Sequence, residues 1–153
     1  MLKGLGILSG IGENVNHIDS KTKLYYLLVL PGYSTSTKDV YEVNTINSND
    51  YTNIDNIIRG FHFDDKDMII DSMSNDLEEA AISINDQEPK IIDIINELNG
   101  LIKENNIHAK AIMSGSGSTV FAAFKDLEGA KIIKEVLKYK NYKMIITSSK
   151  RNA

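Results

Sequence analysis

The sequence predicts an α+β fold in which helices cover one face of an antiparallel sheet. Residues 24–30 (LYYLLVL) form a continuous apolar run closed by Pro31-Gly32, which is typical of a buried strand. Helical patterns follow, and then two apolar segments joined by a serine–glycine loop, a further helical pattern and a last apolar segment. The order strand, helices, strand, strand, helix, strand is that of a split βαβ, ferredoxin-like sandwich.

Before this unit, residues 2–8 predict a glycine-rich strand, and the polar stretch 13–23 is expected to break it. After Pro31-Gly32 a helix is predicted, because Ser36 with Asp39 three residues later fits a capping box.

Three more helices are predicted before the serine–glycine loop. One is short and covers residues 53–59. The next begins near residue 64, and its apolar positions recur three and four apart on one face: Ile69, Met73, Leu77, Ala80 and Ala81. The third opens with Pro89 in its first turn, and its apolar stripe is Ile91, Ile92, Ile94, Ile95, Leu98, Leu101 and Ile102.

The last third of the chain predicts a hairpin of strands at 108–113 and 119–124, then a helix and a strand at 143–147. The apolar positions of that helix are Leu127, Ala130, Ile133, Val136 and Leu137.

Composition restricts the class of protein. With 153 residues the chain fits a single domain, 1–153, and a net charge of −4 argues against a nucleic-acid-binding surface. The absence of cysteine excludes disulfides and thiolate metal sites. No apolar run approaches the roughly 20 residues of a membrane span, and the first residues lack a signal-peptide layout, so we expect a cytoplasmic protein without a membrane partner.

The serine–glycine loop (MSGSGSTV, residues 113–120) is not a P-loop, because no lysine follows it and the next residues are strand-like. One interpretation is a simple hairpin whose glycines supply positive φ. The other is functional: without side-chain bulk, the backbone of residues 114–118 can approach a ligand closely.

Other candidate sites are weak. The acidic clusters at 64–67 and 76–79 lack the EF-hand pattern, and His17, His62 and His108 stand apart. Gly115-Ser116-Gly117 precedes a strand, not the helix of a nucleophile elbow. We therefore assign no metal ligand and no catalytic residue.

Thr37 and Tyr41 lie four apart on a predicted helix, so they share one face. Two interpretations remain open. Tyr41 packs into the core while Thr37 helps to cap the helix, or the ring of Tyr41 is a surface on which a flat ligand stacks.

Four segments occur in a recognisable order: GIGE at 10–13, LLVLPGYSTSTKDVY at 27–41, NDLE at 75–78 and MSGSGSTVF at 113–121. Together they resemble the C-terminal half of the 4-diphosphocytidyl-2-C-methyl-D-erythritol kinase family, within the GHMP kinase superfamily. The resemblance covers nearly the whole chain. The PGYSTST segment favours this family over homoserine or mevalonate kinases.

The resemblance implies ATP- and magnesium-dependent phosphoryl transfer to a hydroxyl of the erythritol part of the substrate, in the non-mevalonate route to isoprenoids. It implies two substrate-binding residues, Tyr41 stacked on the cytosine and Thr37 in the same pocket. It also implies that the glycine-rich loop lies near the phosphate at a domain junction, with the residues Ser114, Gly115, Ser116, Gly117, Ser118 and Thr119. Ser118 stands where many members have proline, and we expect this departure to loosen the loop.

The resemblance also implies a partner. The ATP-cradling motif of the superfamily, and the lysine and aspartate near the transferred phosphate, belong to an N-terminal GHMP kinase domain that is missing here, and the strand in residues 1–12 would normally join that domain. We therefore expect ATP and Mg²⁺ to bind the full-length enzyme, neither to bind this chain alone, and the isolated chain to be inactive. Two alternatives are a stand-alone ferredoxin-like small-molecule-binding module without catalysis and the C-terminal half of another GHMP kinase.

Overall fold

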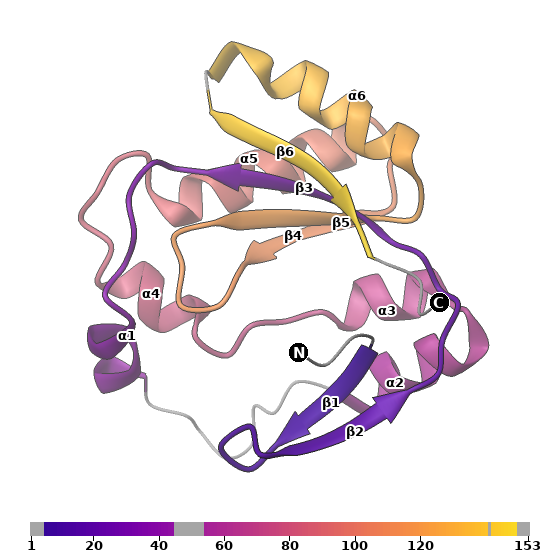
Figure 1. The fold of residues 1–153 in the computed structure, drawn as a ribbon. Coiled ribbons are helices and arrows are strands. Elements are labelled where there is room, and N and C mark those ends of the chain that lie inside the picture. The colour runs from indigo at the N-terminus through magenta and orange to yellow at the C-terminus, as the bar shows by residue number, and fades with distance from the viewer. Residues whose placement is uncertain (1–4, 45–53, 141, 150–153) are drawn as a thin grey trace.

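The computed structural model describes residues 5–44, 54–140 and 142–149 of the chain. Figure 1 shows the fold. The elements in these ranges are β1 (Leu5–Ser9), β2 (Asn14–Ile18), β3 (Tyr25–Leu30), α1 (Thr37–Val43), α2 (Ile54–Phe63), α3 (Lys66–Ser72), α4 (Glu78–Ser83), α5 (Ile91–Glu104), β4 (Ala109–Met113), β5 (Val120–Phe124), α6 (Leu127–Leu137), the short 3-10 helix η1 (Lys138–Lys140) and β6 (Lys143–Ser148). None of the helices within these ranges has the length and apolar character needed to cross a membrane.

The central sheet has four antiparallel strands in the order β4-β5-β3-β6. Val29 of β3 pairs with Val120 of β5 on one side and with Met144 of β6 on the other. The apolar run before the Pro-Gly turn is therefore a central strand. This arrangement confirms the predicted α+β fold with its antiparallel sheet.

The main core lies between this sheet and the helices α5 and α6. Leu27 and Val29 face it from β3, and Leu98 and Ile133 face it from the two helices, all with no exposed surface. Burial of each such aliphatic side chain stabilises the fold by about 1.5–3 kcal/mol. The periodicity predicted the covered face of α5. In α6 it is only partly right, because Ala130, Ile133 and Leu137 are buried whereas Leu127 and Val136 are each 38% exposed.

A smaller core lies on the other side of the sheet, where α3 packs. Leu24, Ile69, Ile70 and Ala123 form it, and Tyr26 and Phe121 pack against it. The rings of the two aromatic residues meet edge to face, with centroids 5.8 Å apart. Helices α5 and α6 cover one face as predicted, and α3 adds a partial layer on the opposite face.

The first hairpin corrects the prediction for residues 13–23. Residues 14–18 form β2, which pairs antiparallel with β1 across a turn in which Gly10 and Gly12 adopt φ values of 70° and 99°. In β2 only Ile18 is buried, so the strand has no apolar alternation to reveal it. The two strands form a separate sheet (Figure 1). Residues 1–4 lie outside the described ranges.

Two helix predictions are also corrected. The apolar pattern from residue 64 to 81 belongs to two helices, because the backbone turns extended at Met73, with φ −63° and ψ 132°. Ile69 packs in the small core, whereas Ala81 packs in the main core. Pro89 precedes its helix instead of lying in the first turn, since Lys90 is the N-cap. The helix predicted at 53–59 extends from Ile54 to Phe63, and residue 53 lies outside the described ranges.

Candidate functional site

The serine–glycine loop joins β4 to β5 as a closed hairpin. The Ser114 amide donates to the Thr119 carbonyl at 2.8 Å, and the Gly117 amide donates to the Ser114 carbonyl at 3.0 Å. Gly115 and Gly117 have φ values of 59° and 92°, which residues with a Cβ rarely adopt. The predicted hairpin with positive-φ glycines is confirmed.

The two glycines have different surroundings. A Cβ on Gly115 would meet no atom within 4 Å, whereas a Cβ on Gly117 would lie 2.8 Å from Met113 Sδ and 3.1 Å from Thr35 Oγ1. The Gly115 side of the loop is therefore open to a ligand, and the Gly117 side is packed against the protein.

Residues 31–37, here called the Pro-Gly segment, contact the loop three times. The Thr35 hydroxyl donates to the Ser116 carbonyl, and the Thr37 and Ser116 hydroxyl oxygens lie 2.8 Å apart. The Ser118 hydroxyl donates to the Tyr33 carbonyl. The structure thus brings Thr37 together with the loop, as a shared site requires.

Ser118 does not behave as the sequence suggested. Its side chain is 3% exposed, and its hydroxyl ties the loop to the Pro-Gly segment. This hydroxyl is a cross-link that a proline ring lacks, and it works against the loosening expected from serine at this position.

Helix α1 presents Thr37 and Tyr41. Ser36 caps the helix, because its hydroxyl accepts from the Asp39 amide, so Thr37 is left to contact Ser116. Val40 is fully buried and anchors the helix, while Tyr41 is 61% exposed. The core-packing interpretation of Tyr41 is wrong, and its ring is accessible to a ligand.

The connection between α3 and α4, together with the first residue of α4, holds the loop from another side. The Asn75 side-chain amide donates to the carbonyls of Met113 and Gly115 at 2.9 and 2.8 Å. A Glu78 carboxylate oxygen accepts from the Met113 amide at 2.7 Å. The NDLE segment carried the family resemblance, but the sequence assigned no role to Asn75 or Glu78, because contacts spanning 35 to 40 residues leave no periodic signal.

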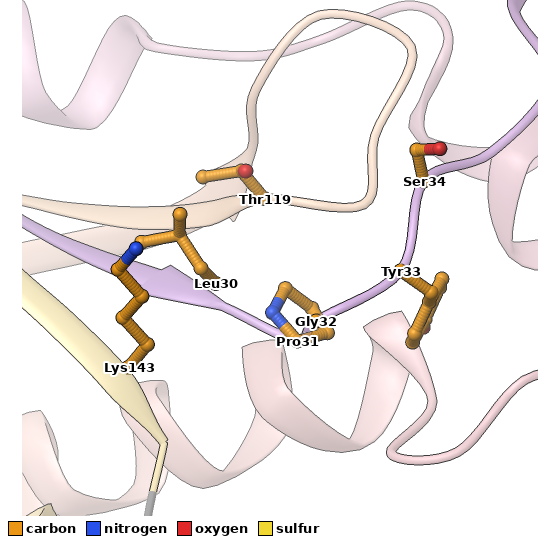
Figure 2. Close-up of a pocket in the computed structure, with 7 residues that line it drawn as sticks. All are labelled: Leu30, Pro31, Gly32, Tyr33, Ser34, Thr119 and Lys143. Atoms are coloured by element: carbon orange, nitrogen blue, oxygen red, sulfur yellow. The ribbon is translucent and has the colours of Figure 1, made fainter.

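A cavity of about 390 Å³ lies beside the Pro-Gly segment. Figure 2 shows its lining residues, Leu30, Pro31, Gly32, Tyr33, Ser34, Thr119 and Lys143. The Tyr33 hydroxyl donates to the Pro89 carbonyl at 2.8 Å, and burial raises the pKa of this phenol. Among the predicted site residues only Thr119 lines the cavity, so the cavity and the exposed Tyr41 ring are separate features.

The charged groups near α3 serve a different purpose. His108 Nε2 lies 3.1 Å from Asp71 and 3.4 Å from Asp67, and Lys125 Nζ lies 2.8 Å from Asp67. The hydrogen bond from Lys125 holds the pKa of Asp67 below its ordinary value of 3.8. These pairs link α3 to the ends of β4 and β5. Within the described part of the chain, no group of three His, Cys, Asp or Glu residues is placed to hold a metal ion.

Comparison with known proteins gives a family match. The profile of the family described as "GHMP kinases C terminal" matches residues 46–143. A protein of Desulfotalea psychrophila named 4-diphosphocytidyl-2-C-methyl-D-erythritol kinase is 35% identical over 130 residues, which are 85% of this chain and 40% of that protein. One of the same name from Clostridium beijerinckii is 30% identical over 145 residues, which are 94% and 49% of the two chains. The chain thus spans less than half the length of these curated relatives.

Solved structures share the fold. A homoserine kinase from Cytophaga hutchinsonii superposes with a TM-score of 0.65 at 18% identity, over 97% of this chain and 49% of that chain. A 4-(cytidine 5'-diphospho)-2C-methyl-D-erythritol kinase gives the same TM-score and identity over 91% and 47% of the two chains. At such identities these likenesses establish the fold alone.

Proposed function

Because the chain belongs to the family of GHMP kinase C-terminal domains, we propose that it is the substrate-binding half of a 4-diphosphocytidyl-2-C-methyl-D-erythritol kinase. This kinase transfers phosphate from ATP to an alcohol group of its substrate, a step of non-mevalonate isoprenoid biosynthesis in the cytoplasm. The observation that carries the proposal is the similarity to proteins of that name along 85% and 94% of the chain. The hydrogen-bond contacts between the Pro-Gly segment and the glycine loop support the proposal, because the proposed substrate site uses residues of both segments.

In this proposal the cytidine end of the substrate lies against α1. The Tyr41 ring is exposed and stacks on the cytosine, because every base offers a π-face to an aromatic side chain. Thr37 lies four residues from Tyr41 on the same face of α1 and lines the proposed cytidine pocket. Its hydroxyl is within hydrogen-bond distance of Ser116. Buried Val40 holds the short helix in place beneath them.

The glycine loop contributes backbone rather than charge. Residues 114–119 contain neither lysine nor arginine, so their contribution near a phosphate comes from amides and hydroxyls. Gly115 is open on its Cβ side, which lets the main chain approach a phosphate closely. The loop thus shapes one wall of the phosphate site.

ATP and Mg²⁺ belong to the complete kinase in this proposal. Phosphoryl transfer needs positioned cations around the nucleotide phosphates. In residues 5–44, 54–140 and 142–149, no group of three or more His, Cys, Asp or Glu residues is placed to hold a metal ion. In this proposal the nucleotide and its metal are held by an N-terminal GHMP kinase domain, the proposed partner of this chain, as the resemblance to the kinase family implies.

The test is ATP-dependent phosphorylation of 4-diphosphocytidyl-2-C-methyl-D-erythritol, followed by mass spectrometry of the product. We expect no product with residues 1–153 alone and product when the N-terminal domain is supplied, in the same polypeptide or separately. Turnover by the chain alone would contradict the division of roles. Phosphorylation of homoserine or mevalonate in place of the cytidine substrate would identify another GHMP kinase.

A further inference from the structure

The glycine loop is held from two sides by segments distant in the sequence. The Pro-Gly segment contacts its second half, at Ser116 and Ser118. Asn75, in the connection between α3 and α4, and Glu78, the first residue of α4, contact the first half of the loop. Figure 1 shows the loop, α1 and α4 together at one end of the molecule.

Asn75 uses both ends of its side-chain amide. The nitrogen donates to the carbonyls of Met113 and Gly115, while the oxygen accepts from the Leu77 amide at 3.1 Å. Two donors and one acceptor on a short side chain are a combination that asparagine supplies and aspartate does not. The same residue therefore fixes the open part of the loop and the start of α4.

Glu78 completes the attachment of Met113, the last residue of β4. Its carboxylate accepts from the Met113 amide, so both backbone polar groups of Met113 are bound by residues 75–78. The Met113 residue is 1% exposed, so these two side chains supply the hydrogen bonds that its backbone groups would otherwise lack. The Glu78 amide in turn donates to the Asn75 carbonyl at 3.0 Å, which holds the two side chains at a fixed separation.

We propose that Asn75, supported by Glu78, is a positioning residue that sets the conformation of the phosphate-proximal loop. Neither residue touches the reacting atoms: Asn75 acts through Gly115, and Glu78 acts through Met113. The inference rests on the proposed kinase function, because the loop matters for turnover only if it borders the transferred phosphate. A displacement of about 1 Å in a positioned group lowers turnover by up to about 100-fold.

The discriminating variant is Asn75→Asp in the complete kinase. The substitution keeps size and shape and retains an acceptor for the Leu77 amide, but it places carboxylate oxygens against the carbonyls of Met113 and Gly115. The matched control is Asn99→Asp. Asn99 on α5 also donates from its side-chain amide to a carbonyl of β4, that of Ala111 at 3.3 Å, and its oxygen accepts from the Ala111 amide at 3.0 Å. Asn99→Asp is therefore the same chemical change at a residue that bonds the same strand, β4, but not the loop.

Glu78 is tested with a conservative and a disruptive substitution. Glu78→Gln keeps an oxygen that accepts from the Met113 amide, and we expect it to retain turnover within about threefold. Glu78→Ala removes the acceptor, and we expect this single variant to reduce turnover as Asn75→Asp does. Retention by the glutamine variant separates hydrogen-bond positioning from a role of the negative charge.

Two readouts decide the inference. For Asn75→Asp we expect kcat to fall on the order of tenfold or more, while KM for the cytidine substrate stays within about threefold. We also expect the Ser114 and Gly117 amides, both hydrogen-bonded within the loop, to exchange faster with solvent. Asn99→Asp should leave both readouts as in the wild type.

Unchanged loop exchange in Asn75→Asp would overturn the inference, and so would faster exchange with unchanged kcat. An equal loss of kcat in Asn99→Asp would also overturn it, because the effect would then be general destabilisation. If the wild-type kinase does not phosphorylate the cytidine substrate, the proposed function fails, and loop exchange alone decides whether Asn75 positions the loop.

Discussion

The hydroxyl oxygens of Thr37 and Ser116 lie 2.8 Å apart, although 79 residues separate them in the chain. Thr37 begins the helix that presents Tyr41, and Ser116 is at the middle of the glycine loop. The contact joins the proposed base-binding helix to the proposed phosphate wall. A ligand that shifts one of the two elements therefore acts on the other.

A double-mutant cycle measures this contact. Thr37→Val and Ser116→Ala each remove one hydroxyl, and we expect a coupling of about 0.5–1 kcal/mol in the free energy of unfolding, the size of one partly exposed hydrogen bond. The control pair is Thr37→Val with Ser20→Ala, whose hydroxyl bonds to the Phe61 carbonyl instead. Urea denaturation of the four variants in each cycle gives the values. A coupling equal to that of the control pair would show that the two hydroxyls act independently.

Removal of the Tyr41 ring should weaken substrate binding selectively. The ring is 61% exposed, so Tyr41→Ala leaves the core intact. We expect a loss of about 1–3 kcal/mol in binding of the cytidine substrate, as for other base–aromatic stacking, with little change in KM for ATP. Tyr41→Phe keeps the stacking surface and should bind as the wild type does.

Tyr139→Ala is the matched control, because this tyrosine lies in η1 and is similarly exposed, at 65%. Steady-state kinetics of the complete kinase at saturating ATP provide the comparison. An unchanged substrate KM in Tyr41→Ala would remove Tyr41 from the site.

Strands that contribute buried residues to both faces of the sheet were predictable from local sequence. The run that became β3 is apolar throughout and ends at Pro31-Gly32, and the cap at Ser36 was visible as a residue pair. β2 was missed because its side chains are mostly exposed, with Ile18 alone buried. The break at Met73 was missed because the apolar period continues across it, although the two halves pack in different cores.

The site was predictable only in its parts. The resemblance indicated the loop and Tyr41, and the structure then placed the loop against the Pro-Gly segment. Asn75 and Glu78 carry no local signal of their role, because a hydrogen bond to a backbone carbonyl or amide is independent of the partner's side chain. Contacts of this kind become visible only in three dimensions.

The two loop glycines should differ in their tolerance of alanine. Gly117→Ala places a Cβ 2.8 Å from Met113 Sδ at a φ of 92°, and overpacking of this kind costs about 1–3 kcal/mol, to which backbone strain adds. Gly115→Ala meets no atom within 4 Å, so its cost is the left-handed backbone alone, about 1–2 kcal/mol. Guanidinium denaturation ranks the two. A larger loss in Gly115→Ala would contradict the packing difference between the two sides of the loop.

The interactions of Asp67 with Lys125 and His108 are expected to make a pH-dependent contribution to the free energy of unfolding. Hydrogen bonding to Lys125, aided by the charge of His108, lowers the pKa of Asp67 in the folded protein below its ordinary 3.8. Because the folded pKa is the lower one, the contribution is present above the ordinary value and is lost as the pH falls through the folded value. Asp67 is 51% exposed, so solvent screens the pair and the contribution is below about 1 kcal/mol.

Asp67→Asn tests this contribution through urea denaturation at several pH values. We expect the variant to be less stable than the wild type at pH 6–7, with the difference shrinking as the pH falls below about 4 and as salt is added. Glu42→Gln is the control, because Glu42 pairs with Lys38 on α1, and both side chains are largely exposed, at 62% and 80%. A difference that stays constant down to pH 2 would mean that Asp67 stabilises α3 through packing or a neutral hydrogen bond, because an ionic contribution disappears when the carboxylate is protonated.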